Sequence, residues 1–239
     1  MNGRELKEAR LGAGWTQQQA AEKLGVTQAY LSMAERGYRV LPSRLARKAV
    51  EVLGASPTAL PLREEGVVAA SDSDKLRAEL AALGYPGFAH VQGSQGRVRV
   101  RRNPAEVLLN ALTQADVDTR VVEGLPWLAY TYADLNWDWA VQNAKLNDLQ
   151  NRLGFVTTVA SGLGAAGARG LPNSEPRSRK LKEYVAVLER SRLAKEDTLC
   201  HDSLTEAERK WLRANRPAEA AHWNLLTDMK AENLAHGRN

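Results

Sequence analysis

Few residues in this chain have the types and the spacing that chemistry needs. Cys200, His201 and Asp202 are contiguous and combine a thiol, an imidazole and a carboxylate. Adjacent side chains on an extended segment diverge, and no second Cys/His pair lies at metal-ligand spacing. The sequence therefore predicts neither a metal site nor a nucleophile at this run.

Two further groups of candidates fail on similar grounds. Asp134, Asp138 and Asp148 could supply a set of carboxylates, but the first two are better placed to cap or charge the first turn of a helix. The Gly162–Gly164 run is not followed by the strand-to-helix pattern of a phosphate-binding loop. We therefore predict no catalytic residue, no cofactor and no enzyme activity.

A stronger pattern lies at Trp15–Gly37, which has the form of two short helices joined by a tight turn. Thr16 and Gln19 can form a capping box for the first helix. Gly25 stands where a sharp turn needs a positive φ, and Thr27 can cap the second helix. Small apolar side chains would let the two helices cross closely. These are Ala20, Ala21 and Leu24.

Residues on both sides of this stretch extend the pattern. The positions concerned are Arg10, Thr16-Gln17, Ala21, Gly25-Val26-Thr27, Leu31-Ser32 and Glu35-Arg36-Gly37. In this order they resemble the Cro/C1 (XRE-type) family of DNA-binding domains over Leu6–Leu62. The resemblance implies a five-helix, lambda-repressor-like domain whose second motif helix lies in the major groove. It also implies that Arg10 and Glu35 pair across the domain as part of its structure.

The resemblance further implies which side chains face DNA. Base edges would be contacted by Gln28, Ala29, Ser32 and Met33. The DNA backbone and the groove rim would be contacted by Gln17, Thr27, Tyr30, Arg39 and Arg44. Two residues depart from the family pattern. Met33 stands at a position that is often basic or polar in the family, and Ala34 at one that usually holds a larger aliphatic residue. The second departure predicts a small void or a compensating neighbour, for which Trp15 is the candidate.

Composition bounds the class of protein. The chain has 239 residues, of which 44% are hydrophobic and 26% charged, as in soluble globular proteins. The formal net charge is +5, and residues 1–62 hold nine Lys and Arg against five Glu, a difference of +4. This excess suits phosphate contact. The single cysteine excludes an internal disulfide and suits a reducing cytoplasm, where we expect the protein to act.

No membrane association is expected. The start of the chain is charged and lacks the apolar region of a signal peptide. The most apolar run, Phe155–Ala168, is shorter than the ~20 residues that a spanning helix needs. We therefore expect the run to be a helix end that leads into a linker.

We predict an all-α fold in two domains. Residues 1–62 would form the helix-turn-helix domain, and residues 63–239 a larger, mainly helical domain for dimerisation or partner binding. A flexible segment is expected near residues 162–179, which are rich in Gly, Ala, Pro and Ser.

Helices in the second domain are indicated by local patterns. A helix over Asp116–Ala129 is expected to be interrupted near Pro126. Thr205 and Glu208 form a second capping box, which opens a helix that would bury Trp211.

Near the end of the chain, Trp223 and Leu226 are expected on one face of a last helix, and the chain from Lys230 is expected to fray. The alternating run Arg97–Arg102 is either a short strand or a basic arm that touches DNA, and the strand is the plainer interpretation.

The densest aromatic region spans residues 127–139, and a long helix is predicted over Trp137–Ala160. Large aromatic side chains usually fill a core, but Trp and Tyr also dominate interface hot spots. The helix would carry an apolar stripe on one face and amides on the other. The predicted partner or dimer surface consists of Trp127, Trp137, Trp139, Leu146, Leu149 and Leu153.

Two functions of different classes remain open. The first is a sequence-specific repressor, autoregulating, that binds double-stranded DNA at a two-fold operator as a homodimer held by its second domain. The second is an antitoxin or interaction protein, whose second domain binds a toxin or another protein encoded nearby. Gln150–Phe155 more distantly resembles regulators of toxin–antitoxin or phage-defence cassettes. An enzyme fused to a DNA-binding head lacks any supporting set of residues.

Overall fold

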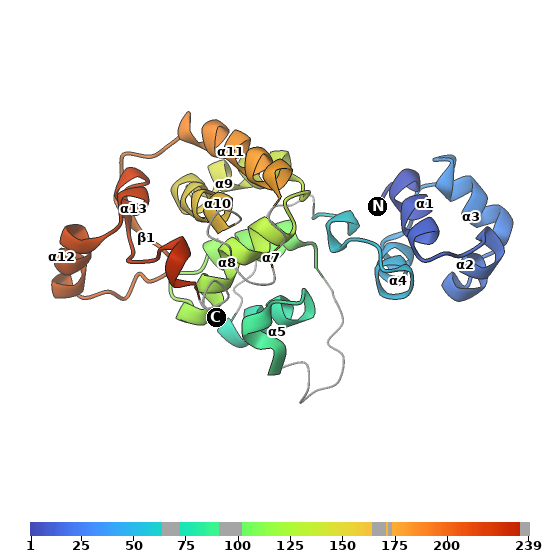
Figure 1. Ribbon diagram of the computed structural model, residues 1–239, viewed down its shortest axis with the longest axis horizontal. Helices are drawn as coiled ribbons and strands as arrows, with labels where there is room; N and C mark the ends of the chain where they lie inside the picture. The colour runs from blue at the N-terminus through green and yellow to red at the C-terminus, as the bar shows by residue number, and fades with distance from the viewer. Residues whose placement is uncertain (64–71, 91–101, 164–170, 172–173, 235–239) are drawn as a thin grey trace.

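A computed structural model describes residues 1–63, 72–90, 102–163, 171 and 174–234. The described chain is mostly helical, as expected for the all-α class (Figure 1). Its one sheet there is a parallel pair of two-residue strands, β1 (Asp197–Thr198) and β2 (Leu225–Leu226). No helix in the described part combines the length and apolar character that a membrane crossing requires.

The N-terminal helices gather at one end of the molecule (Figure 1). They are α1 (Gly3–Gly12), α2 (Gln17–Leu24), α3 (Gln28–Glu35), α4 (Ser43–Leu53) and the 3-10 turn η1 (Pro57–Ala59). The first four are as expected, and the fifth helix of the family pattern is here a single turn, opened by Ser56 and Pro57. Their inward side chains form one buried cluster that includes Leu6, Leu24, Leu31, Leu45 and Leu53.

The caps predicted in this region are confirmed. Thr16 and Gln19 form the reciprocal capping box of α2, and Gly25 ends that helix with φ 73°. The Thr27 hydroxyl accepts a hydrogen bond from the Tyr30 N–H at the start of α3. These are local interactions between residues three apart, which is why the sequence alone could predict them.

A close approach at Gly3 joins α1 to the end of α3. A Cβ atom at this position would lie 2.2 Å from the carbonyl oxygen of Ala34, so no larger residue fits without a shift. Ala34 is itself buried, and Trp15 packs half-buried against the same core.

The second part of the chain begins with α5 and is larger. Its helices are α5 (Ser73–Ala82), η2 (Pro86–Phe88), α7 (Pro104–Leu112), α8 (Thr119–Thr131), α9 (Trp137–Leu146), α10 (Gln150–Leu163), α11 (Glu175–Glu189), α12 (Glu206–Asn215), α13 (Ala218–His222) and η3 (Ala231–Asn233). A single buried cluster, from Leu76 to Leu234, runs through these elements other than α12.

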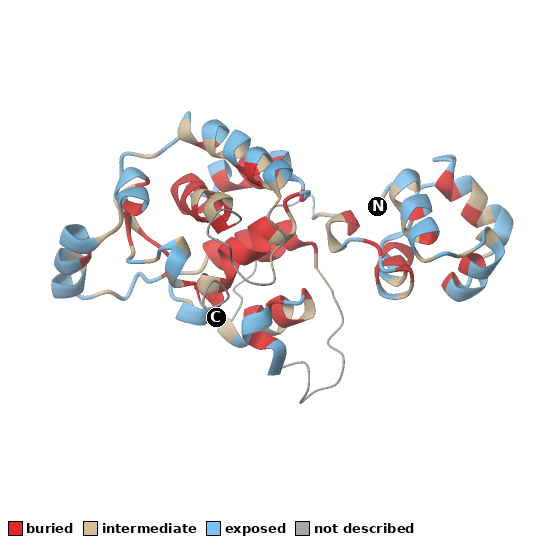
Figure 2. Cartoon of the chain, in the orientation of Figure 1, coloured by how far each residue is buried: buried red, intermediate tan, exposed pale blue. Residues whose placement is uncertain are grey.

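Helix α10 is the centre of this part. It packs mainly against α8 and α11, and nearly all of its residues are buried (Figure 2). Gly154 lets another element approach, because a Cβ there would lie 2.4 Å from the Trp223 indole ring. The N–H of the Trp223 indole donates to the Thr158 hydroxyl at 3.0 Å. The segment after α13 is therefore held directly on the central helix.

The predicted long helix over residues 137–160 is wrong, because the structure divides it into α9 and α10. Asp148 lies between them with φ 56°, in the left-handed region that Asp and Asn tolerate best. The amide of Asn147 donates to the Asn143 carbonyl oxygen at 2.8 Å, at the C-terminal end of α9. The predicted interruption of α8 is also wrong: Pro126 lies inside an unbroken helix, surrounded by buried neighbours.

The structure corrects three expectations near the end of the chain. Trp211 is 56% exposed on α12, although its helix and capping box are as predicted. Leu226 lies in strand β2 and not on a helix. Leu234 is fully buried, so the chain is packed at least to that residue.

Some expectations fall partly or wholly outside the described residues. Within the predicted flexible segment, Gly162 and Leu163 belong to α10, and Glu175–Arg179 belong to α11. Residues 164–170 and 172–173 are outside the described ranges. The basic run is outside as well, except for Arg102.

The two parts of the chain meet at Asn103, which caps α7 as predicted. Its side-chain oxygen accepts from the Ala105 N–H at 3.0 Å. Its amide group donates to the carbonyl oxygens of Thr58 at 2.8 Å and Leu60 at 2.7 Å. These hydrogen bonds join the η1 turn to the first turn of α7. The division into domains near residue 62 stays a prediction.

Candidate DNA interface

Helix α3 presents the residues predicted to contact bases. Gln28, Ala29 and Met33 are exposed and Ser32 is half-buried, whereas Leu31 on the opposite face is fully buried. The helical period of 3.6 residues produces this separation of faces. The four side chains therefore share one outward surface, and their contact with bases stays a prediction.

A buried ion pair lies directly behind this surface. The Arg10 guanidinium donates to the Glu35 carboxylate through Nε at 2.6 Å and Nη2 at 3.1 Å. A third donor, Nη1, bonds the Trp15 carbonyl oxygen at 2.8 Å. Both charged side chains are almost fully buried. The pairing implied by the family resemblance is confirmed, and it joins α1, the α1–α2 loop and α3.

Two amides connect the ion pair to the surface. Gln17 Nε2 donates to Glu35 Oε2 at 2.9 Å, and Gln28 Nε2 donates to Gln17 Oε1 at 3.0 Å. A continuous chain of hydrogen bonds thus runs from Arg10 to the first residue of α3. In this structure Gln17, predicted at a phosphate, positions Gln28. Residue type and spacing alone did not reveal that role, because the two glutamines are eleven positions apart.

The protonation state of Glu35 supports this chain. Burial by itself would raise the pKa of its carboxyl, but hydrogen bonds from Arg10 and Gln17 and the Arg10 charge outweigh burial. The pKa is consequently held below its ordinary value, and the carboxylate stays ionised at neutral pH. An ionised carboxylate accepts from both neighbours at once, which fixes the orientation of the Gln17 amide.

Basic side chains flank the outward face of α3. Arg39 and Arg44 are exposed in the loop after α3 and in the first turn of α4, and Arg36 is exposed beside them. None of the three has an ion-pair partner among the described residues. Lys48 differs, because its ammonium group caps α2 by donating to the Leu24 carbonyl oxygen at 2.9 Å. The three arginines are therefore available for phosphates.

The predicted partner surface is mostly buried in this chain's own core. Trp127 and Trp137 are buried, and the Trp137 ring stacks on Tyr184 with centroids 5.3 Å apart. Only two members of the predicted surface keep appreciable exposure. Trp139 is half-buried, Leu146 is 74% exposed, and the buried members also include Leu149 and Leu153. The core interpretation fits the aromatic residues, and a partner contact would have to use Leu146 and its surroundings.

The Cys200–Asp202 run has a structural arrangement. The Cys200 thiol is fully buried and donates to the Ala111 carbonyl oxygen at 3.4 Å. Burial raises its pKa to about 12, so the reactive thiolate is scarce at neutral pH. His201 is exposed, and the Asp202 carboxylate accepts from Arg152 at 3.1 Å. Among the described residues, no group of three or more His, Cys, Asp and Glu side chains is placed to hold a metal ion.

Arg152 anchors the second part of the chain and was missed at the level of sequence. Its guanidinium donates to both oxygens of Asp197 at 2.7 and 2.8 Å. It also donates to the carbonyl oxygens of Leu112 at 3.0 Å and Gln114 at 3.1 Å. Although burial would raise the pKa of Asp197, the hydrogen bond and charge of Arg152 lower it.

Comparison with known proteins supports the N-terminal interface. Residues 6–60 match the family model described as helix-turn-helix, which is of the Cro/C1 type. Residues 6–60 thus form a DNA-binding helix-turn-helix region of the kind found in transcription regulators. No curated protein and no solved structure matches the chain.

Proposed function

We propose that this chain is a sequence-specific repressor that binds a two-fold operator as a dimer and regulates its own synthesis. The observation that carries the proposal is the exposed face of α3, with the Gln28 amide held by Gln17 and unpaired arginines beside it. DNA binding would place its action in the cytoplasm.

Gln28 would read an adenine. Its hydrogen bond to Gln17 uses one amide N–H, which leaves the second N–H and the carbonyl oxygen for a bidentate contact to adenine N6 and N7. Arg39 and Arg44 would hold neighbouring phosphates and set the register of the helix in the groove. The exposed Met33 would contribute an apolar contact, for example with a thymine methyl group.

A dimer is proposed because one helix-turn-helix reads too few base pairs. A single module buries little surface on DNA and discriminates poorly among genomic sites. Two recognition helices about 34 Å apart would enter successive major grooves and double the sequence that is read. Exposed apolar side chains suitable for self-association occur in both parts of the chain, namely Leu11, Tyr38, Val40, Leu146, Val187 and Trp211.

Selection from a random DNA pool followed by titration tests this function. The full chain should enrich a sequence with two-fold symmetry and bind it at least ~10³-fold more tightly than random DNA. Light scattering of the same sample should give the mass of a dimer. Enrichment of no sequence would refute specific regulation, and an asymmetric site bound by one chain would refute the two-fold arrangement.

A second candidate function is the capture of another protein by the C-terminal part, with DNA binding secondary. It is favoured by Trp211, because an exposed tryptophan on a helix at the end of the molecule opposite the DNA-binding domain is the residue type most enriched in hot spots (Figure 1). A monomeric full chain whose operator affinity equals that of residues 1–62 alone would favour this candidate over the dimeric repressor.

A further inference from the structure

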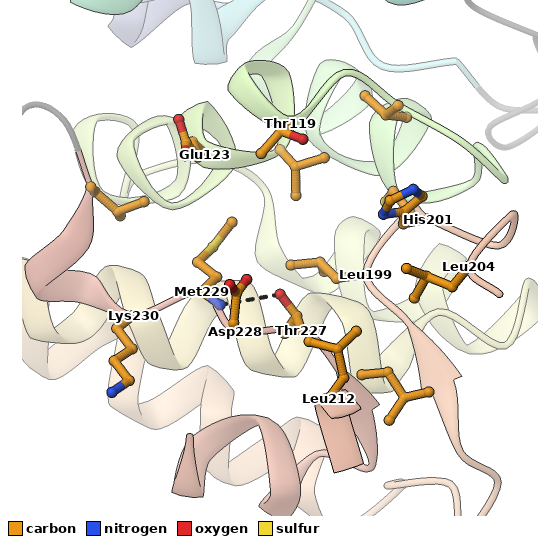
Figure 3. A pocket seen from close by; sticks show the side chains of 15 residues that line it. Thr119, Glu123, Leu199, His201, Leu204, Leu212, Thr227, Asp228, Met229 and Lys230 are labelled. Atoms are coloured by element: carbon orange, nitrogen blue, oxygen red, sulfur yellow. Dashed lines mark hydrogen bonds between the residues drawn. The ribbon is translucent and has the colours of Figure 1, made fainter. Parts of the chain in front are cut away.

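The C-terminal part contains a cavity of about 240 Å³ that neither the DNA interface nor the ion-pair network uses. Four stretches that are distant in sequence line it: the first turns of α8, the segment after β1, helix α12, and the segment from β2 to Leu234 (Figure 3). The volume exceeds the roughly 150 Å³ of a cavity that holds benzene, so a ring with a short side chain would fit.

Aliphatic side chains form part of the cavity lining, beside polar ones. They are Val122, Leu199, Leu204, Leu212, Leu226 and Leu234. Most of these side chains are buried in the protein, yet they leave this hollow unfilled. An apolar group that displaced the solvent from it would gain free energy in proportion to the apolar area covered.

The charge at the rim is predominantly negative. Glu123 on α8 and Asp228 after β2 line the opening, and the Asp228 side chain stands beside Met229 and Thr227 in the wall (Figure 3). Neither carboxylate has a hydrogen-bonded or ion-paired cation among the described residues. Lys230 also belongs to the rim, but its chain extends away from the other labelled side chains (Figure 3).

We propose that this cavity binds a small organic cation with an apolar body, in which a protonated amine is carried on a ring by a short linker. The ring would lie against the aliphatic side chains of the lining, and the ammonium group would lie between Glu123 and Asp228. The hydroxyl of Thr119, in the wall next to Glu123, supplies a further acceptor for an ammonium N–H. This ligand site is independent of the proposed DNA-binding function.

Three probes of matched size test the proposal on the full chain without DNA. Calorimetric or ligand-observed NMR titration would compare 2-phenylethylamine with the neutral 2-phenylethanol and the anionic 3-phenylpropionate. The amine should bind saturably. The alcohol should bind about two- to fivefold more weakly, which is the range expected for a solvent-accessible ion pair, and the anion should bind more weakly still.

Matched variants assign the effect to the rim. Glu123→Gln and Asp228→Asn should each weaken the amine about two- to fivefold while leaving the alcohol unchanged. Glu183→Gln, on the exposed side of α11, removes the same charge elsewhere and should change neither titration. Leu204→Trp should fill the cavity and abolish binding of all three probes, with circular dichroism confirming the fold.

Two results would overturn the proposal. The first is equal affinity for the amine and the alcohol, or no saturable binding of the amine at all. The second is amine binding that survives Leu204→Trp, which would place the probe elsewhere on the protein. Neither result depends on whether the chain recognises an operator, so the two proposals can fail separately.

Discussion

The two parts of this protein each contain a buried arginine paired with a carboxylate, but the hydrogen bonds around the two pairs lead to different groups. Arg10–Glu35 continues outward through Gln17 to the exposed Gln28. Arg152–Asp197 continues to the backbone and to a second carboxylate, because the remaining guanidinium donors bond the carbonyl oxygens of Leu112 and Gln114 and the carboxylate of Asp202. The same chemistry supports a recognition surface in one place and closes a fold in the other.

The difference lies in what each arginine leaves for its carboxylate. Glu35 keeps one oxygen available for a second neutral donor, and that donor is a side chain whose other end is at the surface. Asp197, which is half-buried, receives two guanidinium N–H groups and the Thr198 N–H. In this protein the Arg10–Glu35 pair is connected through uncharged side chains to the candidate DNA surface, and the Arg152–Asp197 pair is connected to a second carboxylate, that of Asp202.

The largest expected effect on stability comes from breaking the Arg152–Asp197 pair. Arg152→Met should reduce the free energy of unfolding by about 3–5 kcal/mol, because it leaves the half-buried Asp197 carboxylate and two carbonyl oxygens without their charged donor. Urea denaturation followed by circular dichroism measures this. Arg213→Met removes an exposed pair with Glu196 and should cost less than about 1 kcal/mol. Equal costs for the two variants would remove Arg152 as an anchor.

The second effect concerns base readout. Gln28→Ala should weaken operator binding by about 1–3 kcal/mol and leave binding to random DNA unchanged. Fluorescence anisotropy with both DNAs at one salt concentration provides the comparison. Glu22→Ala, at an exposed position on α2, is the matched control and should leave the ratio of the two affinities unchanged. Equal losses on both DNAs would show that Gln28 contacts no base.

The third effect concerns phosphates. Arg39→Ala and Arg44→Ala should each reduce the slope of log K against log salt by about one unit, since each releases about one counterion fewer. Lys210→Ala on α12 removes an equal charge from the other part of the chain and should leave the slope unchanged. A slope that moves equally in all three variants would mean that net charge, and not the local surface, sets the salt dependence.

Local interactions were predictable from the sequence, and distant ones were not. The capping boxes at Thr16 and Thr205 and the turn at Gly25 each depend on residues three or four apart. The break at Asp148 depends on a single left-handed residue in an otherwise helical pattern, which periodicity alone does not reveal.

Burial within the C-terminal part of the chain depends on tertiary contacts. The sequence placed Trp137 in the aromatic region and predicted that Trp211 is buried, but only Trp137 is buried, with its ring stacked on that of Tyr184. Arg152 and Asp197 are forty-five positions apart, so no spacing rule connects them. The candidate DNA surface could be predicted because a family resemblance supplied the tertiary context, and the matching family model spans residues 6–60.

The smallest expected effect tests whether the hydrogen bond between Gln17 and Gln28 contributes to DNA binding. Gln17→Leu removes the hydrogen bond to Gln28 and should weaken operator binding by less than about 1 kcal/mol, because it loosens the reading side chain without deleting it. The loss should vanish in a Gln28→Ala background, since Gln17 then has nothing to position. A double-mutant cycle measures this coupling. If the two losses simply add, Gln17 acts on a phosphate by itself. The chain of hydrogen bonds from Arg10 would then stabilise the domain without contributing to readout, as Arg152 does in the other part of the molecule.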